Sequence, residues 1–163
     1  MDGSVLLDIL SRYVFNIANI QGMLRLATPV VLAGLCALIT DRAGILNIAG
    51  EGMILLGAWF AVAASYFFGS SMMGLLGGIV AGLVVGALFA LFSLKFRAHI
   101  IVMGIAINIF ADAATIFLTR SVFGVAGGFT DPKIVGFGAI QIPIIKDIPI
   151  LGELLSGYTF IVY

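Results

Sequence analysis

The sequence predicts an all-α fold: a polytopic membrane helical bundle with a broken second helix and a glycine-striped third helix. Three observations indicate this class. Hydrophobic types make up 62% of the 163 residues and charged types only 10%, against roughly 25% in a soluble domain. The mean hydropathy is +1.24, and four apolar runs approach the ~20 residues of a transmembrane helix. Polar residues gather at the head of the second run, whereas glycines recur at a fixed interval in the third.

The domain organisation follows from the order of these segments. Residues 1–22 are expected to form an amphipathic helix in the membrane interface, because apolar residues recur there at helical spacing and polar residues fill the other side. Residues 23–118 should hold four transmembrane helices. Residues 119–149, with several glycines and prolines, should form an extracellular loop or cap. Residues 150–163 start another apolar run that is far shorter than a span, and we interpret it as a truncated further transmembrane helix.

The four spans are placed at residues 23–40, 53–68, 72–94 and 100–118. Pro29 falls within the first two turns of the first span, where its missing N–H does least harm. Gly-Ser-Ser after the second span predicts a tight turn. The short loops at 41–46 and 95–97 carry arginine and lysine, so we expect both in the cytoplasm and the N-terminus outside.

Small residues line one side of the third span. Glycines recur there at every fourth position, and Ala90 continues the line; the glycines are Gly74, Gly78, Gly82 and Gly86. In lipid, helices associate through close backbone approach rather than through a hydrophobic drive, so this stripe predicts helix packing. The stripe is either plain packing within one subunit or a surface that moves during a conformational cycle.

The second apolar run opens on Asn-Ile-Ala-Gly-Glu-Gly, from Asn47 to Gly52. Three interpretations of Glu51 stay open. It is an interfacial residue favoured by the helix dipole, or part of a helix break that is covered by protein or lines a wet cavity, or a proton-relay carboxylate. Under the second interpretation, regular helix begins near Glu51, and its carboxylate holds the free N–H groups of the break.

The fourth span carries a polar face. Gly104, Asn108 and Asp112 are four residues apart and Thr115 follows three later, so all four share one side of a helix. A charge at mid-span costs at least ~2.5 kcal/mol, so Asp112 should face protein or water, or be protonated. The face is either a hydrogen-bonded bridge between helices or the lining of a polar path. The candidate substrate-pathway residues are Asn47, Glu51, Asn108, Asp112 and Thr115.

Other kinds of chemistry lack a sequence signal. No cluster of cysteine, histidine and acidic residues has metal-ligand spacing, and there is no phosphate-binding loop or nucleophile elbow. We therefore expect no metal, no cofactor and no enzyme activity. The formal net charge is zero and there is no long basic run, so nucleic-acid binding is not expected either.

Three segments carry a family resemblance. They are ATPVVLAGLCALITDRAGILNIAGEGMILLGAW (27–59), FRAHIIVMGIAINIFA (96–111) and IPILGELLSGYTFIVY (148–163). The first resembles the opening of the permease subunits of nucleoside and simple-sugar ABC importers, a group related to the ribose and branched-chain amino-acid permeases. That family has Thr-Pro in its first span, an acidic-Arg-x-Gly turn, and then Asn-Ile-x-x-Glu-Gly-Met. The second segment is similar to a further family signature, with Gly104 and Asn108 in place.

The resemblance implies a permease subunit that works with a second permease subunit, identical or different, with two cytoplasmic ATPases and with an extracellular substrate-binding protein. It implies a multi-pass protein of a bacterial or archaeal plasma membrane. Asp112 departs from the family pattern, which has an apolar or small residue there, so no role carries over to it. Such permeases are much longer than this chain, which resembles their N-terminal half.

Two alternatives from other classes stay open. An ion- or proton-coupled carrier or channel would use Glu51 and Asp112, and a membrane scaffold subunit would transport nothing. ATP dependence of uptake, collapse with an ion gradient, or absence of uptake would distinguish the three.

Overall fold

The computed structural model of the chain describes residues 17–138 and Thr159. The chain divides into two compact units, residues 1–32 with 137–163 and residues 33–136. Most of the interfacial helix expected over residues 1–22, and all of the expected start of a further span except Thr159, lie outside the described residues.

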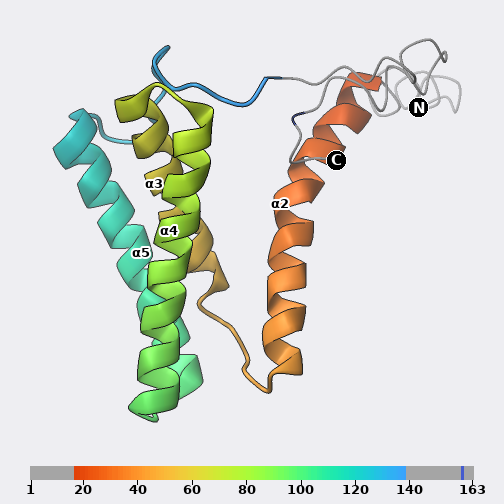
Figure 1. The fold of residues 1–163 in the computed structure, drawn as a ribbon, viewed down its shortest axis with the longest axis vertical. Helices are drawn as coiled ribbons and strands as arrows, with labels where there is room; N and C mark the ends of the chain where they lie inside the picture. Colours follow the sequence, from red (N-terminus) through yellow and green to blue (C-terminus); the bar gives the residue numbers. More distant parts are fainter. Residues whose placement is uncertain (1–16, 139–158, 160–163) are drawn as a thin grey trace, which may run out of the picture. The chain divides into compact units, whose positions relative to one another are not determined.

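All regular structure in the described part of the chain is helical (Figure 1). The elements are α2 (Ile17–Arg42), α3 (Gly50–Phe68), α4 (Ser71–Ala90), the π-helix η2 (Leu91–Lys95) and α5 (Ile100–Phe123). Four stretches are long and apolar enough to cross a membrane: Asn19–Arg42, Gly50–Phe68, Ser71–Lys95 and Ile100–Phe123. The prediction of an all-α membrane bundle is thus confirmed, and α5 runs to Phe123, beyond the expected end at 118.

Within the described residues, helix α2 already includes residues 17–22, so this part of the expected interfacial helix is continuous with the first span. Pro29 therefore lies well inside the helix, and its expected place in the first two turns is wrong. An interior proline removes one hydrogen bond of the helix and favours a kink. Next to it, the Thr28 hydroxyl donates to the Leu24 carbonyl at 3.0 Å, a bond that also tends to bend helices.

A glycine turn ends α2 at Asp-Arg-Ala-Gly. Gly44 has φ +75°, the left-handed conformation that glycine adopts without steric cost. The Ile45 N–H donates to the Thr40 carbonyl at 3.0 Å and the Gly44 N–H to the Asp41 carbonyl at 2.9 Å. These two bonds make a Schellman motif, which satisfies the last carbonyls of the helix and releases the chain into the loop before α3.

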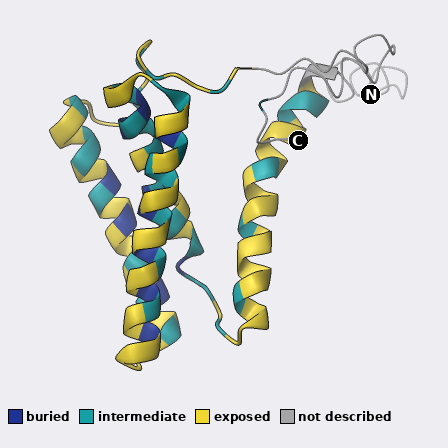
Figure 2. Ribbon diagram, in the orientation of Figure 1, coloured by how far each residue is buried: buried dark blue, intermediate teal, exposed yellow. Residues whose placement is uncertain are grey.

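Helix α3 is central in the unit formed by residues 33–136, since it packs against both α4 and α5. The core there consists of Leu56, Val85 and Ala111, one residue from each of the three helices. Figure 2 shows buried residues where these helices face one another and exposed apolar residues on their outer faces. This is the pattern of a bundle that packs through small contacts and presents its outside to lipid.

The glycine stripe of α4 packs over only part of its length. An added Cβ at Gly74 or Gly78 would lie 3.0 to 3.2 Å from a backbone oxygen of α3, whereas one at Gly82 or Gly86 would meet nothing within 4 Å. Within the described residues, the predicted packing of the stripe is therefore found at Gly74 and Gly78, and no neighbouring helix lies against Gly82 or Gly86. The reason is geometric, because positions four apart rotate by about 40° per step around an α-helix and soon leave one face. Sequence spacing also missed Gly77, where a Cβ would lie 2.7 Å from the Ala64 Cβ.

The third span closes in the π-helix η2, where the Phe96 N–H donates to the Leu91 carbonyl five residues back at 3.2 Å. Tight glycine caps end the neighbouring helices. Gly69 (φ +61°) closes α3 and confirms the predicted turn, and Gly124 (φ +69°) closes α5.

Candidate functional site

The helix break before α3 is held by a side chain from α5. The Asn108 Nδ2 donates to the Ile48 carbonyl at 3.0 Å, and the Gly52 N–H donates to the Asn108 Oδ1 at 2.8 Å. A single amide thus pairs one carbonyl before the helix and one N–H in its first turn. Both groups would otherwise lack partners at a helix start, where backbone N–H groups have no acceptor within the helix. We call this arrangement the Asn108 clamp.

Two glycines let the backbones approach closely enough for the clamp. A Cβ at Gly52 would lie 2.9 Å from the Asn108 Oδ1 and 3.0 Å from the Ile107 carbonyl oxygen. A Cβ at Gly104 would lie 2.8 Å from the Ile48 Cβ. Ala49, between the two contacts, is fully buried. The break therefore packs on α5 at Ala49 and Gly52, both of which are buried, and its other residues are partly covered.

The structure assigns the pairing role at the break to Asn108 rather than to Glu51. Helix α3 starts at Gly50, close to the expected start, and its N-cap has no side-chain hydrogen bond. Glu51 is exposed, on the first turn of the helix. Asn47 is half-buried; its Nδ2 lies 3.9 Å from the Met53 Sδ, and its Oδ1 has no hydrogen-bond partner among the described residues.

A cavity of about 420 Å³ lies farther along the same pair of helices. Its wall comes from α3, α5 and the loop after α5, and the lining residues are Leu55, Ala58, Trp59, Val62, Asp112, Thr115, Ile116, Thr119, Phe123, Gly127 and Phe129. Asp112 and Thr115 thus come together in one cavity. Its size falls within the range of small-molecule sites, which are mostly apolar with a few placed polar groups.

Hydrogen bonds order one wall of this cavity. The Trp59 Nε1 donates to the Thr119 Oγ1 at 3.0 Å, and the Thr119 hydroxyl donates to the Thr115 carbonyl at 2.6 Å. The Thr115 hydroxyl lies within hydrogen-bonding distance of the carbonyls of Ala111 (2.9 Å) and Asp112 (3.0 Å). The indole and both hydroxyl protons are therefore committed to protein acceptors.

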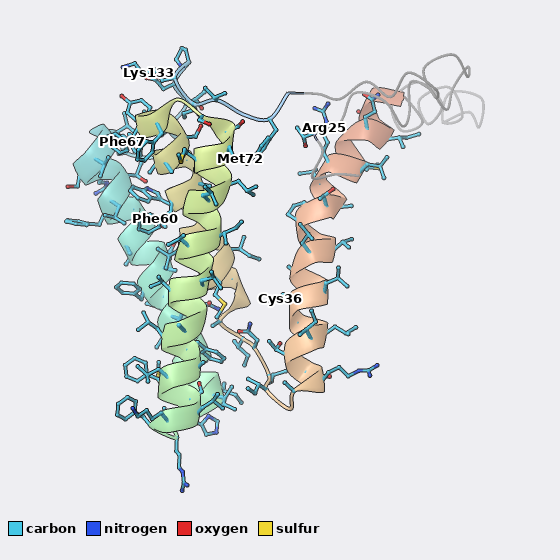
Figure 3. The ribbon with its side chains drawn as sticks, viewed as in Figure 1. Arg25, Cys36, Phe60, Phe67, Met72 and Lys133 are labelled. Atoms are coloured by element: carbon cyan, nitrogen blue, oxygen red, sulfur yellow. The ribbon has the colours of Figure 1, made fainter. Side chains whose placement is uncertain are left out.

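The loop after α5 folds back over one end of the cavity. The Ser65 hydroxyl donates to the Val135 carbonyl at 2.8 Å and accepts the Val135 N–H at 3.0 Å. The Phe129 ring stacks on Phe123 with centroids 4.0 Å apart. The Lys133 ammonium lies 5.6 Å from the centre of the Tyr66 ring, and Figure 3 shows Lys133 at the same end of the bundle as Phe67.

The five candidate pathway residues therefore occupy different places. Asn47 and Asn108 belong to the break, Glu51 lies on the exposed side of the first turn of α3, and Asp112 and Thr115 line the cavity. Trp59 and Thr119 were not among the residues predicted from the sequence. Thr119 continues the four-residue spacing from Thr115 and could have been found by it, whereas no local signal indicates that Trp59 would reach it.

Several membrane-length helices around a covered helix break and a partly polar cavity define a class, the multi-pass membrane transport proteins. The chain belongs to the family described as the permease component of the branched-chain amino acid transport system, whose members match residues 19–155. The resemblance to ABC importer permeases, and the prediction of a multi-pass plasma-membrane protein, are thereby confirmed.

Three curated relatives come from bacteria and an archaeon. The guanosine ABC transporter permease protein of Bacillus subtilis is 34% identical over 78% of this chain and 41% of its own length. The nucleoside ABC transporter permease protein of Lactococcus lactis is 29% identical over 86% of this chain and 45% of its own. A protein of Haloferax volcanii, provisionally named as a glucose ABC transporter permease, is 29% identical over 85% and 41%.

The chain thus spans less than half the length of these curated relatives. No solved structure matches it.

Proposed function

We propose that the chain contributes to the transmembrane pathway of an ATP-driven importer of nucleosides or simple sugars. The observation that carries this proposal is the family match across residues 19–155. The names of the relatives supply the substrate classes, nucleosides in two cases and glucose in the third. ATP hydrolysis would take place in separate cytoplasmic subunits, with a second permease subunit and an extracellular substrate-binding protein completing the transporter.

Within the chain, the cavity between α3 and α5 is the proposed substrate station. It combines aromatic side chains, the Asp112 carboxylate and two threonines, which suits a small neutral polar molecule. Asn47 and Glu51 remain candidate pathway residues at the break, where they would act at a different stage from Asp112 and Thr115.

An ion- or proton-coupled carrier finds less support. Such a mechanism would pass charge between Glu51 and Asp112, and the cavity lined by Asp112 does not include Glu51 among its lining residues. A scaffold without transport would have no use for an aromatic cavity with a carboxylate. The family match favours the importer over both.

The test is uptake into proteoliposomes that hold the complete transporter, with ATP inside and the binding protein outside. We expect accumulation of a labelled nucleoside or sugar that requires ATP and survives an ionophore that collapses ion gradients. Uptake that follows the ion gradient and ignores ATP would overturn the proposal.

A further inference from the structure

The Asp112 carboxylate is the unpaired polar group of the cavity. Within the described residues, it makes no hydrogen bond or ion pair, and Asp112 is exposed toward the open cavity. The other polar side chains of the lining have their protons engaged, in the bonds from Trp59, Thr115 and Thr119. The cavity therefore offers a ligand strong acceptors and few donors, and it selects for a ligand that itself donates hydrogen bonds.

The rest of the lining favours a flat or ring-shaped ligand. Trp59, Phe123 and Phe129 supply aromatic surface from α3, α5 and the loop after α5. Aromatic faces pack against the C–H face of a sugar ring and against a heterocyclic base alike. The aromatic surface alone does not distinguish a nucleoside from a sugar. The group that pairs with the Asp112 carboxylate must therefore be one that both classes of molecule carry.

Nucleosides and simple sugars share a pair of neighbouring ring hydroxyls. We propose that Asp112 is a specificity-determining residue that accepts hydrogen bonds from such a vicinal diol, and this inference rests on the proposed function. A carboxylate has two oxygens with room for two donors side by side, and hydrogen bonds to an ionised acceptor are stronger than neutral ones. Acidic side chains hold the ribose hydroxyls of dinucleotides through the same chemistry.

Two consequences follow from this geometry. A nucleoside without the 2′- and 3′-hydroxyls leaves the carboxylate without donors, so it should be a poor substrate even though its base is intact. A phosphorylated nucleoside or sugar brings a negative charge toward Asp112, and like charges at close range repel. The site thus accepts a neutral diol and rejects its phosphate ester.

The experiment measures ATP-driven uptake of adenosine and of 2′,3′-dideoxyadenosine by the complete transporter in proteoliposomes, with free ribose as a third substrate. Wild type is compared with Asp112→Asn. The control Asp131→Asn removes the same charge from the loop after α5 and keeps an oxygen for the Lys133 N–H, which Asp131 Oδ1 accepts at 2.9 Å. The same binding protein is used throughout, so a change in preference comes from the permease.

Wild type should prefer the diol over the dideoxy nucleoside by about ten-fold, equivalent to about 1.4 kcal/mol. Asp112→Asn should reduce this preference to about two-fold or less, and Asp131→Asn should keep it. Unlabelled dideoxyadenosine should compete poorly for adenosine uptake in wild type and clearly better in Asp112→Asn, and this change with the same binding protein assigns the discrimination to the permease.

Equal uptake of the diol and dideoxy substrates by wild type would overturn the inference, as would an unchanged preference in Asp112→Asn or a loss of uptake equal for both substrates. Each of these outcomes leaves ATP-driven import intact, whereas absence of ATP-driven uptake of any of the substrates contradicts the proposed function itself. If the transporter takes up ribose as well as adenosine, Asp112 recognises the diol of sugars in general. If it takes up adenosine alone, Asp112 recognises the diol of a nucleoside.

Discussion

The contact between α3 and α5 is built in opposite ways at its two ends. At the start of α3, Gly52 and Gly104 bring backbone and side chains together, and the Asn108 amide closes two hydrogen bonds. Farther along, the same helices and the loop after α5 line an open cavity of about 420 Å³, with the Asp112 carboxylate on its wall. At the first end the helices are close-packed and the Asn108 amide is hydrogen-bonded. At the other end there is a cavity, and the Asp112 carboxylate has no hydrogen-bond partner among the described residues.

This difference suggests different roles for the polar residues of α5 under the proposed function. Asn108 and Asp112 are one helical turn apart, so a helical pattern places them on one face and suggests one role. The Asn108 amide uses one N–H donor and its oxygen to bond backbone groups of the break, so its orientation is fixed by the protein. Asp112 has its capacity free. The clamp would fix α3 against α5 while the cavity binds and releases a ligand.

The largest expected effect is that of Asn108→Leu. It leaves the Gly52 N–H and the Ile48 carbonyl without partners, at about 1–3 kcal/mol for each buried group. We expect a clear loss of thermal stability and of membrane yield, measured by the melting temperature of the purified protein. Asp112→Ala, one turn away, should change stability by less than about 0.5 kcal/mol, since no protein contact is lost. Equal destabilisation by the two variants would contradict the view that Asn108 stabilises the contact between α3 and α5 and Asp112 does not.

A second comparison concerns the glycines of α4. Gly77→Ala introduces a Cβ 2.9 Å from the Phe60 carbonyl oxygen, so we expect a loss of about 1–3 kcal/mol through overpacking. Gly82→Ala meets nothing within 4 Å and should be neutral or slightly stabilising, because alanine favours a helix. Melting temperatures of the two single variants, measured side by side in the same detergent, check this. A large loss at Gly82 would mean that this position contacts a helix of another subunit or segment.

A smaller effect is expected at the loop that covers the cavity. Ser65→Ala removes both hydrogen bonds to Val135, and leaves its N–H and carbonyl without that partner. Hydrogen exchange of the Val135 amide should become about ten-fold faster, equivalent to about 1.4 kcal/mol of local opening. Ser70→Ala is the control, because Ser70 makes no capping bond at the start of α4. Unchanged exchange at Val135 would show that other contacts hold the loop.

The smallest effect is expected for Glu51. Glu51→Gln and Glu51→Ala should both cost about 0.3–1 kcal/mol, the range of a charge near a helix N-terminus. Their similarity follows from the exposed position of Glu51 and from the pairing of the Gly52 N–H by Asn108. Melting temperatures of the purified variants check the change in stability, and uptake per assembled transporter checks whether the charge is needed for transport. If Glu51→Gln abolishes uptake at normal yield, the charge itself is required, and that result supports the proton-relay interpretation.

The sequence predicted the spans and the break because both depend on local properties. Apolar runs of membrane length, the turn at Gly69 and the polar and glycine residues around Glu51 are visible without any knowledge of neighbours, and the family resemblance supplied the turn at Gly44. The spacing of the glycine stripe predicted helix packing at all four glycines. Among the described residues only Gly74 and Gly78 show it, because a regular four-residue spacing slowly turns away from the partner helix.

The roles within the site depend on tertiary contacts and could not be read from spacing. Their shared helical face selects Asn108 and Asp112 together. Only the position of the backbone before and within α3 determines that the Asn108 amide bonds to it. The link from Trp59 to Thr119 joins residues 60 positions apart, which no local pattern indicates. The residue types predicted which hydrogen-bonding groups the site contains. The packing of α3 on α5 determined which of these groups lack a partner among the described residues.

The central claim is that the cavity between α3 and α5 binds the transported molecule, and Trp59 provides a direct measurement of it. Trp59 is the one tryptophan of the 163-residue sequence and lines that cavity. Its emission is obtained as the difference between the complete transporter with wild-type chain and with Trp59→Phe.

We predict a saturable change in this emission when adenosine or ribose is added, weakened by Asp112→Asn and unaffected by Asp131→Asn. An emission that stays constant at substrate concentrations that saturate ATP-driven uptake would contradict the claim.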